Sequence, residues 1–347
     1  VVLDNMVHAV VVRCPHPGGK AEKFHGPEGQ PGFLGLEAFD PPAQASLFLP
    51  KGGVAVIADS TWHAVKYAQS LQVAWSDSDA LAFDSDAFQA ELREMVQQPA
   101  KVVYDRGNVD KTLEQGVSQL EATYETPFLA HAPMEPPVAL ASVHDGVCEV
   151  WAPVQDPQDT RTWVARWLKL PEEKITINVT MLGGAFGRKS KPDFVLEAVE
   201  LSRRLQRPVR VTWRREDDIQ HDYYHAASAQ YHRASLDADG RPLAWLQRTA
   251  FPTISSTFSL DATEPSRGEL EMGFSNLPYR VENQRYESTG KRCGIRIGWM
   301  RSVCNIFHSF SSNVFADEMA SAANADPINY RLGLLEGLPD MLEVPGD

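Results

Sequence analysis

The chain has 347 residues, of which 43% are hydrophobic and 23% are charged, and its formal net charge is −13. This length exceeds that of one ordinary domain, so more than one hydrophobic core is expected. A strongly acidic surface repels nucleic acids and anionic lipids, which are therefore not expected partners. The sequence contains no run of 18 or more apolar residues, so it predicts no membrane-spanning helix.

The first part of the chain favours a small α/β unit. Residues 14–53 are rich in Pro and Gly, which is typical of loops. The hydrophobic pattern after them predicts a βαβ-like unit followed by an amphipathic helix. The expected elements are a buried strand (54–58), a helix capped by Thr61 (61–69), a short strand (73–75) and a helix (86–98) with Phe88, Leu92, Met95 and Val96 on one side.

The pattern changes from about residue 117, where strands and helices mix. Expected strands are 117–125, 138–143, 147–151, 175–181, 209–213, 227–236 and 243–251. Expected helices are 160–168, 192–206, 305–323 and a short helix that opens at Pro327. Phe307, Phe310, Val314 and Met319 are expected on the apolar side of the helix 305–323. A mixed α+β fold follows from this order.

The four cysteines carry little functional signal. They are Cys14, Cys148, Cys293 and Cys304, and no two of them form a Cys-x-x-Cys pair. Partly buried free thiols are therefore favoured over a disulfide or a cysteine-bound metal.

A glycine-rich segment, residues 182–190, lies between an expected strand and an expected helix. Glycines at such a place let backbone N–H groups approach a ligand, and the helix that follows favours an anion. The spacing fits neither a Walker A loop, whose second Gly would fall on Arg188, nor the Gly-x-Gly-x-x-Gly fingerprint. Taken alone, the segment is equally compatible with a tightly packed turn between strand and helix.

Longer stretches around this segment resemble a known family. Residues 150–189, VWAPVQDPQDTRTWVARWLKLPEEKITINVTMLGGAFGRK, resemble the signature of the large subunit of molybdenum hydroxylases. This is the xanthine dehydrogenase/aldehyde oxidase family, here in its isoquinoline 1-oxidoreductase and membrane-associated aldehyde dehydrogenase branch. Residues 126–143 and 299–335 resemble further segments in the same order, and the resemblance covers roughly residues 6–337.

The resemblance implies a domain organisation. Residues 1–95 are expected to form a small α/β hammerhead-type domain, and residues 96–347 the first molybdopterin-cofactor-binding domain. The family's second cofactor domain carries a Gly-x-Gly-Glu segment whose glutamate is the general base. That segment does not occur in this sequence, so the second cofactor domain is expected on a separate polypeptide or in a part outside residues 1–347.

The resemblance also implies site residues. Gln155 is expected to act in catalysis by donating to the apical oxygen of the molybdenum, and Glu135 is expected to line the substrate pocket. No protein side chain is expected to ligate the metal, and His131 is interpreted as structural. A capped loop residue remains the alternative for Gln155, and a salt bridge for Arg301. The expected cofactor contacts are Gly183, Gly184, Ala185, Phe186, Gly187, Arg188 and Arg301.

The function implied is oxidation of an aldehyde or N-heterocycle with water as the oxygen source. The implied cofactors are molybdopterin cytosine dinucleotide with molybdenum, and 2Fe-2S clusters on a partner. An iron–sulfur subunit and the polypeptide with the second cofactor domain are expected partners, and a cytochrome c subunit is a further candidate. A periplasmic or periplasmic-side membrane-associated location is expected, with the cytoplasm as the alternative. Two other functions stay open: a nucleotide-dependent enzyme that uses residues 183–190, and a non-catalytic scaffold half of a cofactor-binding subunit.

Overall fold

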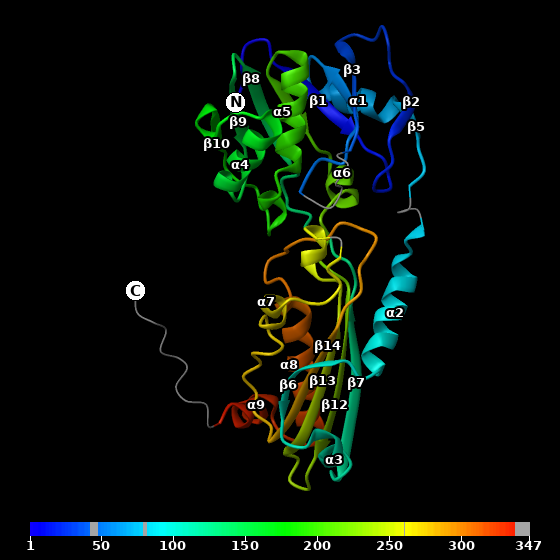
Figure 1. The fold of residues 1–347 in the computed structure, drawn as a ribbon, viewed down its shortest axis with the longest axis vertical. Helices are drawn as coiled ribbons and strands as arrows, with labels where there is room; N and C mark the ends of the chain where they lie inside the picture. Colours follow the sequence, from blue (N-terminus) through cyan, green and yellow to red (C-terminus); the bar gives the residue numbers. More distant parts are fainter. Residues whose placement is uncertain (42–47, 79–81, 260, 337–347) are drawn as a thin grey trace.

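The computed structural model describes residues 1–41, 48–78, 82–259 and 261–336. Its helices and strands form two lobes stacked along the long axis of the molecule (Figure 1). The upper lobe contains β1 (Val7–Val12), β2 (Ala21–His25), β3 (Phe33–Phe39), β4 (Gly53–Ala58), α1 (Thr61–Ser70), β5 (Gln72–Trp75), β8 (Val138–His144), β9 (Val147–Ala152), α4 (Pro157–Leu168), β10 (Ile175–Val179), α5 (Asp193–Leu205), β11 (Val209–Thr212) and α6 (Arg215–Gln220).

The lower lobe is built from the segments between and after these elements. It contains α2 (Ser85–Gln97), β6 (Lys101–Arg106), α3 (Val109–Leu113), β7 (Ser118–Thr126), β12 (Ser228–Leu236), β13 (Pro242–Ala250), α7 (Arg267–Leu270), β14 (Asn283–Thr289), α8 (Asn305–Ala322) and α9 (Pro327–Leu335). Short 3-10 helices are η2 (Glu172–Lys174), η3 (Arg188–Ser190) and η4 (Ile254–Thr257). The chain therefore passes from the upper lobe to the lower, returns, and passes down again. The mixed α+β class predicted from the sequence is confirmed.

The upper lobe is organised by a seven-stranded sheet with the order β10-β9-β8-β11-β1-β4-β3. β1 lies in its interior, parallel to β11 and antiparallel to β4. Side chains of β1 alternate between the two faces: Val7, Ala9 and Val11 join the core under α5, whereas Val10 joins the core under α1. This sheet takes strands from both sides of residue 95, and the domain division proposed there stays a prediction.

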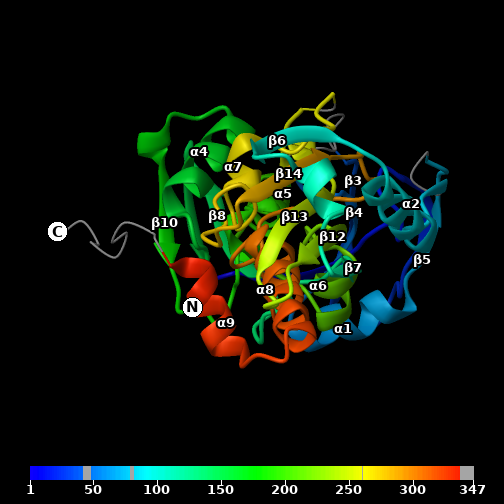
Figure 2. The same cartoon turned by 90° about the horizontal axis from the view of Figure 1, so that it is seen from below.

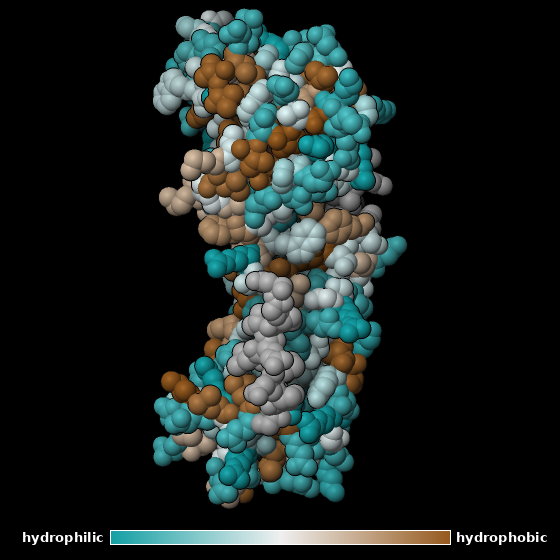
Figure 3. All heavy atoms as spheres, turned by 90° about the vertical axis from the view of Figure 1, so that its left-hand side faces the viewer, coloured by the Kyte–Doolittle hydropathy of each residue, from teal (hydrophilic) through white to brown (hydrophobic). Residues whose placement is uncertain are grey.

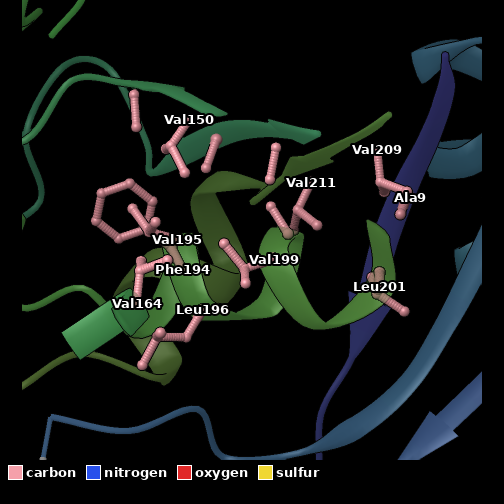
Figure 4. Packing of buried hydrophobic residues seen from close by; sticks show 14 of the residues in the cluster. Ala9, Val150, Val164, Phe194, Val195, Leu196, Val199, Leu201, Val209 and Val211 are labelled. Carbon is pink, nitrogen blue, oxygen red and sulfur yellow. The ribbon is translucent and has the colours of Figure 1, made fainter. Parts of the chain in front are cut away.

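The α5 helix forms the centre of the largest core. Every residue from Asp193 to Ser202 is buried, because small residues such as Ala139 and Ala141 on the sheet let the helix approach closely. Figure 4 shows Val195 and Val199 on the side of α5 that faces the strands. The N-terminal end of α5 follows the glycine-rich segment, so this core fixes where that segment lies.

The lower lobe is a five-stranded sheet with a helix on each face. The strand order is β6-β14-β13-β12-β7. Leu246 and its neighbours on one face pack under α2, while Trp245 on the other face packs against α8. Figure 2 shows α2 and α8 on opposite sides of β12 and β13. None of the described helices is long and apolar enough to cross a membrane.

One prediction for the N-terminal segment was wrong, and two strands there were not predicted. β4 and β5 do not form a βαβ unit, because β4 pairs with β1 and β3 while β5 pairs antiparallel with β2 in a separate two-stranded sheet. The loop-rich residues 14–53 contain two strands, β2 and β3, whose Gly and Pro neighbours obscure their alternation.

Two details of helices also differ from expectation. Ser60, rather than Thr61, caps α1, because its side chain accepts the backbone N–H of His63. On α8, Phe307 and Met319 are buried as predicted, but Phe310 is exposed and contacts the Tyr124 ring at the rim. The inward position belongs instead to Phe315, because His308, Ser311 and Ser312 extend the buried stripe with polar side chains that hydrophobic periodicity does not reveal.

Candidate functional site

The glycine-rich segment forms an exposed, left-handed loop between β10 and η3. Gly184, Phe186 and Gly187 have φ values of 94°, 56° and 106°. A phenylalanine rarely adopts this conformation, and Phe186 is 45% exposed. Residues held in unfavourable backbone conformations cluster at functional sites. The loop is therefore a candidate site on conformational grounds, independent of its glycine content.

Gln155 lies directly against this loop. Its backbone N–H donates to the carbonyl of Lys189 at 2.9 Å, and its side-chain Oε1 accepts the N–H of Gly187 at 3.0 Å. The amide is fixed through its oxygen, and Nε2 makes no hydrogen bond within the described ranges. The structure thus brings Gln155 to the loop, with a free amide donor.

Arg301 reaches the loop from the other side, on the turn that precedes α8. Its backbone N–H donates to the carbonyl of Phe186 at 2.8 Å. The next two residues, Ser302 and Val303, have φ values of 71° and 45°, a strained pair because valine is β-branched. Among the residues that the structure describes, no carboxylate pairs with the Arg301 guanidinium. The structure brings the loop, Gln155 and Arg301 together, and their roles toward a cofactor stay predictions.

The donors around the loop fit an oxygen-rich anionic group. The backbone N–H groups of Gly184, Ala185 and Phe186 have no acceptor within the described part of the chain, whereas those of Gly183 and Gly187 are paired. Unpaired N–H groups in left-handed turns form anion-binding concavities. The amide of Gln155 adds to this donor set, and the backbone of Arg301 is held against the loop. In a chain of net charge −13, this local group of donors fits an anionic ligand better than the charge of the whole chain does.

Glu135 holds the start of the loop. Its backbone N–H donates to the carbonyl of Gly183 at 2.9 Å, and its Oε2 accepts the N–H of Gly183 at 3.0 Å. The same oxygen pairs with the fully buried ammonium of Lys189. The sequence predicted a substrate-side carboxylate. The structure shows a carboxylate already neutralised by Lys189, which is the partner that a carboxylate in an apolar segment requires.

Glu135 also borders an open groove of about 460 Å³ on the upper lobe. The groove has an apolar wall that includes Trp151 and Met181, and polar atoms from Thr180 and Arg210. Figure 3 shows hydrophobic atoms gathered in patches on the upper half of one face of the molecule. Met134 and Met181, on either side of the loop, are 87% and 94% exposed.

Arg188 turns its side chain into the protein. The guanidinium is fully buried, pairs with both oxygens of Asp193 at 2.9 and 3.0 Å, and lies 3.1 Å from Asp222. It also stacks over the rings of Trp213 and Tyr223. Only the backbone of Arg188 is therefore available to contact a cofactor.

Asp222 connects Arg188 to His131, the histidine interpreted as structural. Nδ1 of His131 donates to Asp222 at 2.9 Å, and Nε2 donates to the carbonyl of Trp299 at 2.8 Å. Burial raises the pKa of Asp222, but the hydrogen bond from His131 and the charge of Arg188 outweigh burial and lower the pKa to about 2. His131 thus contacts an acceptor with each ring nitrogen and joins Asp222 to the Trp299 carbonyl.

Sequence reasoning missed the buried charges beneath the loop. Burial lowers the pKa of Lys191 to about 7, and the charge of Arg188 adds to this shift. Asp193 and Glu197 were detectable, since they fall four residues apart on the inward side of a helix with Val195. Asp222 gave no signal, because its partner His131 lies far away in the chain.

No group of three or more His, Cys, Asp or Glu side chains that could hold a metal occurs among the described residues. The four cysteines are buried free thiols. Burial raises the pKa of Cys148 to about 12 and that of Cys293 to about 11, which makes both poor thiolate ligands.

The chain is similar in sequence and fold to known proteins. Residues 94–333 match the family described as the molybdopterin cofactor-binding domain. A nicotinate dehydrogenase subunit from Pseudomonas putida is 32% identical over 343 residues, an alignment of 95% of this chain and 28% of that protein. The beta subunit of isoquinoline 1-oxidoreductase from Brevundimonas diminuta is 28% identical, over 84% of this chain and 39% of that protein. The chain therefore spans less than half the length of these curated relatives.

The fold is shared with solved structures. The crystal structure of quinoline 2-oxidoreductase from Pseudomonas putida 86 superposes with a TM-score of 0.70, at 20% identity, over 95% of this chain and 46% of that one. The family match covers the loop, Gln155 and Arg301 together. The chain belongs to the molybdopterin cofactor-binding domain family.

Proposed function

We propose that this chain provides the first cofactor-binding half of a molybdenum hydroxylase that oxidises N-heterocycles or aldehydes, with water as the oxygen source. The observation that carries the proposal is the convergence at the loop of the unpaired amide of Gln155 and the unpaired N–H groups of residues 184–186, with the backbone of Arg301 bound to the carbonyl of Phe186. Neither rival function explains this arrangement, since the loop fits neither nucleotide motif and a mere scaffold needs no free donors.

The cofactor that we propose is molybdopterin cytosine dinucleotide with molybdenum, which supplies the two-electron redox chemistry when bound. Gln155 would donate to it through Nε2, the residues 184–186 through backbone N–H groups, and Arg301 through its guanidinium. Phe186 and the neighbouring apolar side chains exclude water from that face. The division into a hammerhead-type domain (1–95) and a first cofactor domain (96–347) belongs to the same proposal.

The substrate class is supported by the names of the relatives. Nicotinate, isoquinoline and quinoline are all aromatic N-heterocycles, so these are the first substrates to test, with aldehydes as the second class. We further propose that electrons leave through 2Fe-2S clusters on a partner subunit and that a cytochrome c subunit is a candidate acceptor. The general base would come from the second cofactor domain, and the assembly would face the periplasm.

The proposal is tested on the complete subunit, co-expressed with the products of the neighbouring reading frames. Molybdenum and a cytosine dinucleotide should co-purify, and N-heterocycle oxidation with an artificial electron acceptor in H₂¹⁸O should place ¹⁸O in the product. ATP or NAD binding at the loop would support the nucleotide-dependent alternative. A correctly assembled complex without any cofactor would support the scaffold. Cell fractionation of the tagged complex decides the location.

A further inference from the structure

A single buried lysine joins the two loops that carry the candidate site. Lys191 follows η3 directly, and its side chain is fully buried. Its Nζ donates to the carbonyl oxygen of Gly187 at 2.6 Å and to that of Trp299 at 2.9 Å. Within the described ranges no carboxylate lies within ion-pair distance of Nζ. Burial of an amino group without such a pair is costly, so the two carbonyl oxygens are the contacts that compensate for it.

The two backbones meet too closely to be held by packing alone. A Cβ atom at Gly187 would lie 2.1 Å from the carbonyl oxygen of Trp299, so the chains are in direct contact there. Two carbonyl oxygens that converge on one point repel each other, and a donor shared between them replaces that repulsion with attraction. Nε2 of His131 donates to the same oxygen of Trp299, and Nζ of Lys191 lies 5.6 Å from the centre of the Trp299 ring.

Each of the two carbonyls belongs to a residue that controls a candidate cofactor contact. The N–H of Gly187 donates to Oε1 of Gln155, which orients the amide and leaves Nε2 free. Trp299 stands two residues before Arg301, whose N–H donates to the carbonyl of Phe186. Ser190 supports the arrangement, because its hydroxyl donates to the carbonyl of Gly187 at 2.7 Å.

The geometry points to Lys191 as a positioning residue that fixes the orientation of Gln155 relative to Arg301 by tying the Gly187 carbonyl to the Trp299 carbonyl. The inference rests on the proposed function in that Gln155 and Arg301 act on the bound cofactor. Lys191 itself touches neither substrate nor cofactor in this role. It acts through two backbone groups.

The test compares Lys191→Met with Lys51→Met in the complete, co-expressed enzyme. Methionine matches the lysine chain in length and has no donor. Lys51 is the control, because it is a half-buried lysine of the upper lobe whose Nζ lies 3.4 Å from Nδ1 of His221 and makes no hydrogen bond to the loop. The readouts are kcat and KM per bound molybdenum, the electron paramagnetic resonance spectrum of the partly reduced enzyme, and hydrogen exchange of residues 183–190 and 299–304 in the cofactor-free protein.

For Lys191→Met we expect kcat per molybdenum to fall roughly 10- to 100-fold with KM changed less than about threefold, since small misplacements of positioned groups have effects of this size. The resonance spectrum should shift, and hydrogen exchange in both segments should accelerate. For Lys51→Met, these readouts should stay at the unsubstituted values even where stability falls. Unchanged kcat, spectrum and exchange in Lys191→Met would overturn the inference, and so would equal losses in both variants.

A second variant covers the case in which Lys191→Met does not fold. Lys191→Gln keeps an N–H donor without the charge, so it should retain part of the kcat and protect the two segments partly. Behaviour identical to the unsubstituted protein in every readout would again overturn the inference. An unsubstituted enzyme that lacks molybdenum contradicts the proposed function instead, and the hydrogen-exchange comparison still decides whether Lys191 holds the two loops.

Discussion

Gly187 carries two independent constraints at one position. Its φ of 106° is unfavourable for any residue with a side chain, and a Cβ there would lie 2.1 Å from the carbonyl oxygen of Trp299. Gly146, at the tip of the hairpin between β8 and β9, has a φ of 74° but no heavy atom within 4 Å of an added Cβ. Substitutions at these two glycines therefore separate the energetic cost of backbone strain from the cost of the close contact with Trp299.

We expect Gly187→Ala to lower the free energy of unfolding by about 3 kcal/mol, since strain and overpacking add. Gly146→Ala should lower it by about 1 kcal/mol, from strain alone. Molybdenum occupancy should fall only in Gly187→Ala. Urea unfolding measures the change in stability, and metal analysis measures molybdenum occupancy. Equal destabilisation by the two substitutions would show that the close contact of Gly187 with Trp299 adds no cost of its own.

The lowered pKa of Asp222, which contacts Arg188 and His131, makes the stability of the folded protein depend on pH in acid. Its pKa in the folded protein, about 2, lies below the ordinary value of 3.8. A carboxylate with a lowered pKa stabilises the fold above its unfolded-state pKa, and this contribution is lost as the pH falls toward the folded-state value. The full contribution is about 2 kcal/mol, lost between about pH 5 and pH 2.

Between pH 5 and pH 3, the unsubstituted protein should lose roughly 1 kcal/mol more stability than Asp222→Asn, which cannot titrate there. Asp222→Asn should be less stable at pH 7, because it leaves Arg188 with one fewer buried counter-charge. Unfolding free energies measured at several pH values test this. Parallel pH profiles for the two proteins would mean that Asp222 titrates with an ordinary pKa.

At the scale of elements, the cap of α4, Asp156, directly follows Gln155. Oδ1 of Asp156 accepts the N–H of Asp159 at 2.9 Å and caps the helix. Asp84 caps α2 in the lower lobe in the same way, by accepting the N–H groups of Asp86 and Ala87. The two caps are chemically alike, and only the first adjoins the candidate site.

Asp156→Ala and Asp84→Ala should each cost about 1 kcal/mol of stability, which is typical for the loss of a cap. Only Asp156→Ala should also lower turnover, because it frees the segment that carries Gln155. Asp156→Ser, which can still cap, should restore both quantities. Thermal unfolding and steady-state kinetics provide the comparison, and a loss of turnover in Asp84→Ala of the same size would assign the effect to general destabilisation.

The elements that sequence patterns predicted well are those with one buried face. The helix with Phe88 and Leu92, the hairpin around residue 145 and the paired strands β12 and β13 follow from hydrophobic periodicity. Two strands were not predicted because they lack an apolar alternation. Most residues of β6 are exposed, and β14 is largely buried but contains mainly polar side chains. Local patterns also do not encode which strands pair, so the error over β4 and β5 was unavoidable.

The site was predictable in part for the same physical reason. The loop, Gln155 and Arg301 lie on segments whose order resembles a family, and the structure brings them together. The buried side chains of Lys191, His131 and Asp222 contact segments that are distant in the chain, and such contacts cannot be inferred from a single sequence. The direction of the Arg188 side chain also could not be inferred, because a charged residue beside an exposed loop is usually solvated.

At the scale of the molecule, apolar side chains surround the candidate site without cover. They are Met134, Met181, Leu182, Phe186, Phe258 and Trp299. Exposed apolar side chains gathered near one site favour either an interaction or aggregation. We therefore expect residues 1–347, produced alone, to self-associate and to show no turnover, and to remain dispersed when co-expressed with the rest of the assembly.

The contribution to self-association of the apolar side chains around the loop can be separated from that of other exposed apolar residues. Met134→Ser combined with Met181→Ser should reduce self-association of residues 1–347 in light scattering. Ile328→Ser combined with Leu332→Ser, on exposed positions of α9, is the matched control and should change little. If the control pair reduces self-association equally, the surface around the loop is not what drives it.

The pairing of β1 with β11 means that the upper sheet cannot be completed until long after β1 has been synthesised. Val7 lies beside Val209, so the centre of the upper sheet cannot close until the ribosome has released the strand that contains residue 209. At roughly 5–20 residues per second, about 10–40 s pass between the appearance of the two strands. During that interval β1 presents an unpaired edge rich in valine, which is a template for wrong pairing. Synonymous codons that slow translation between β4 and β11 lengthen this interval, so they should lower the yield of folded protein, and co-expression of a chaperone should restore it.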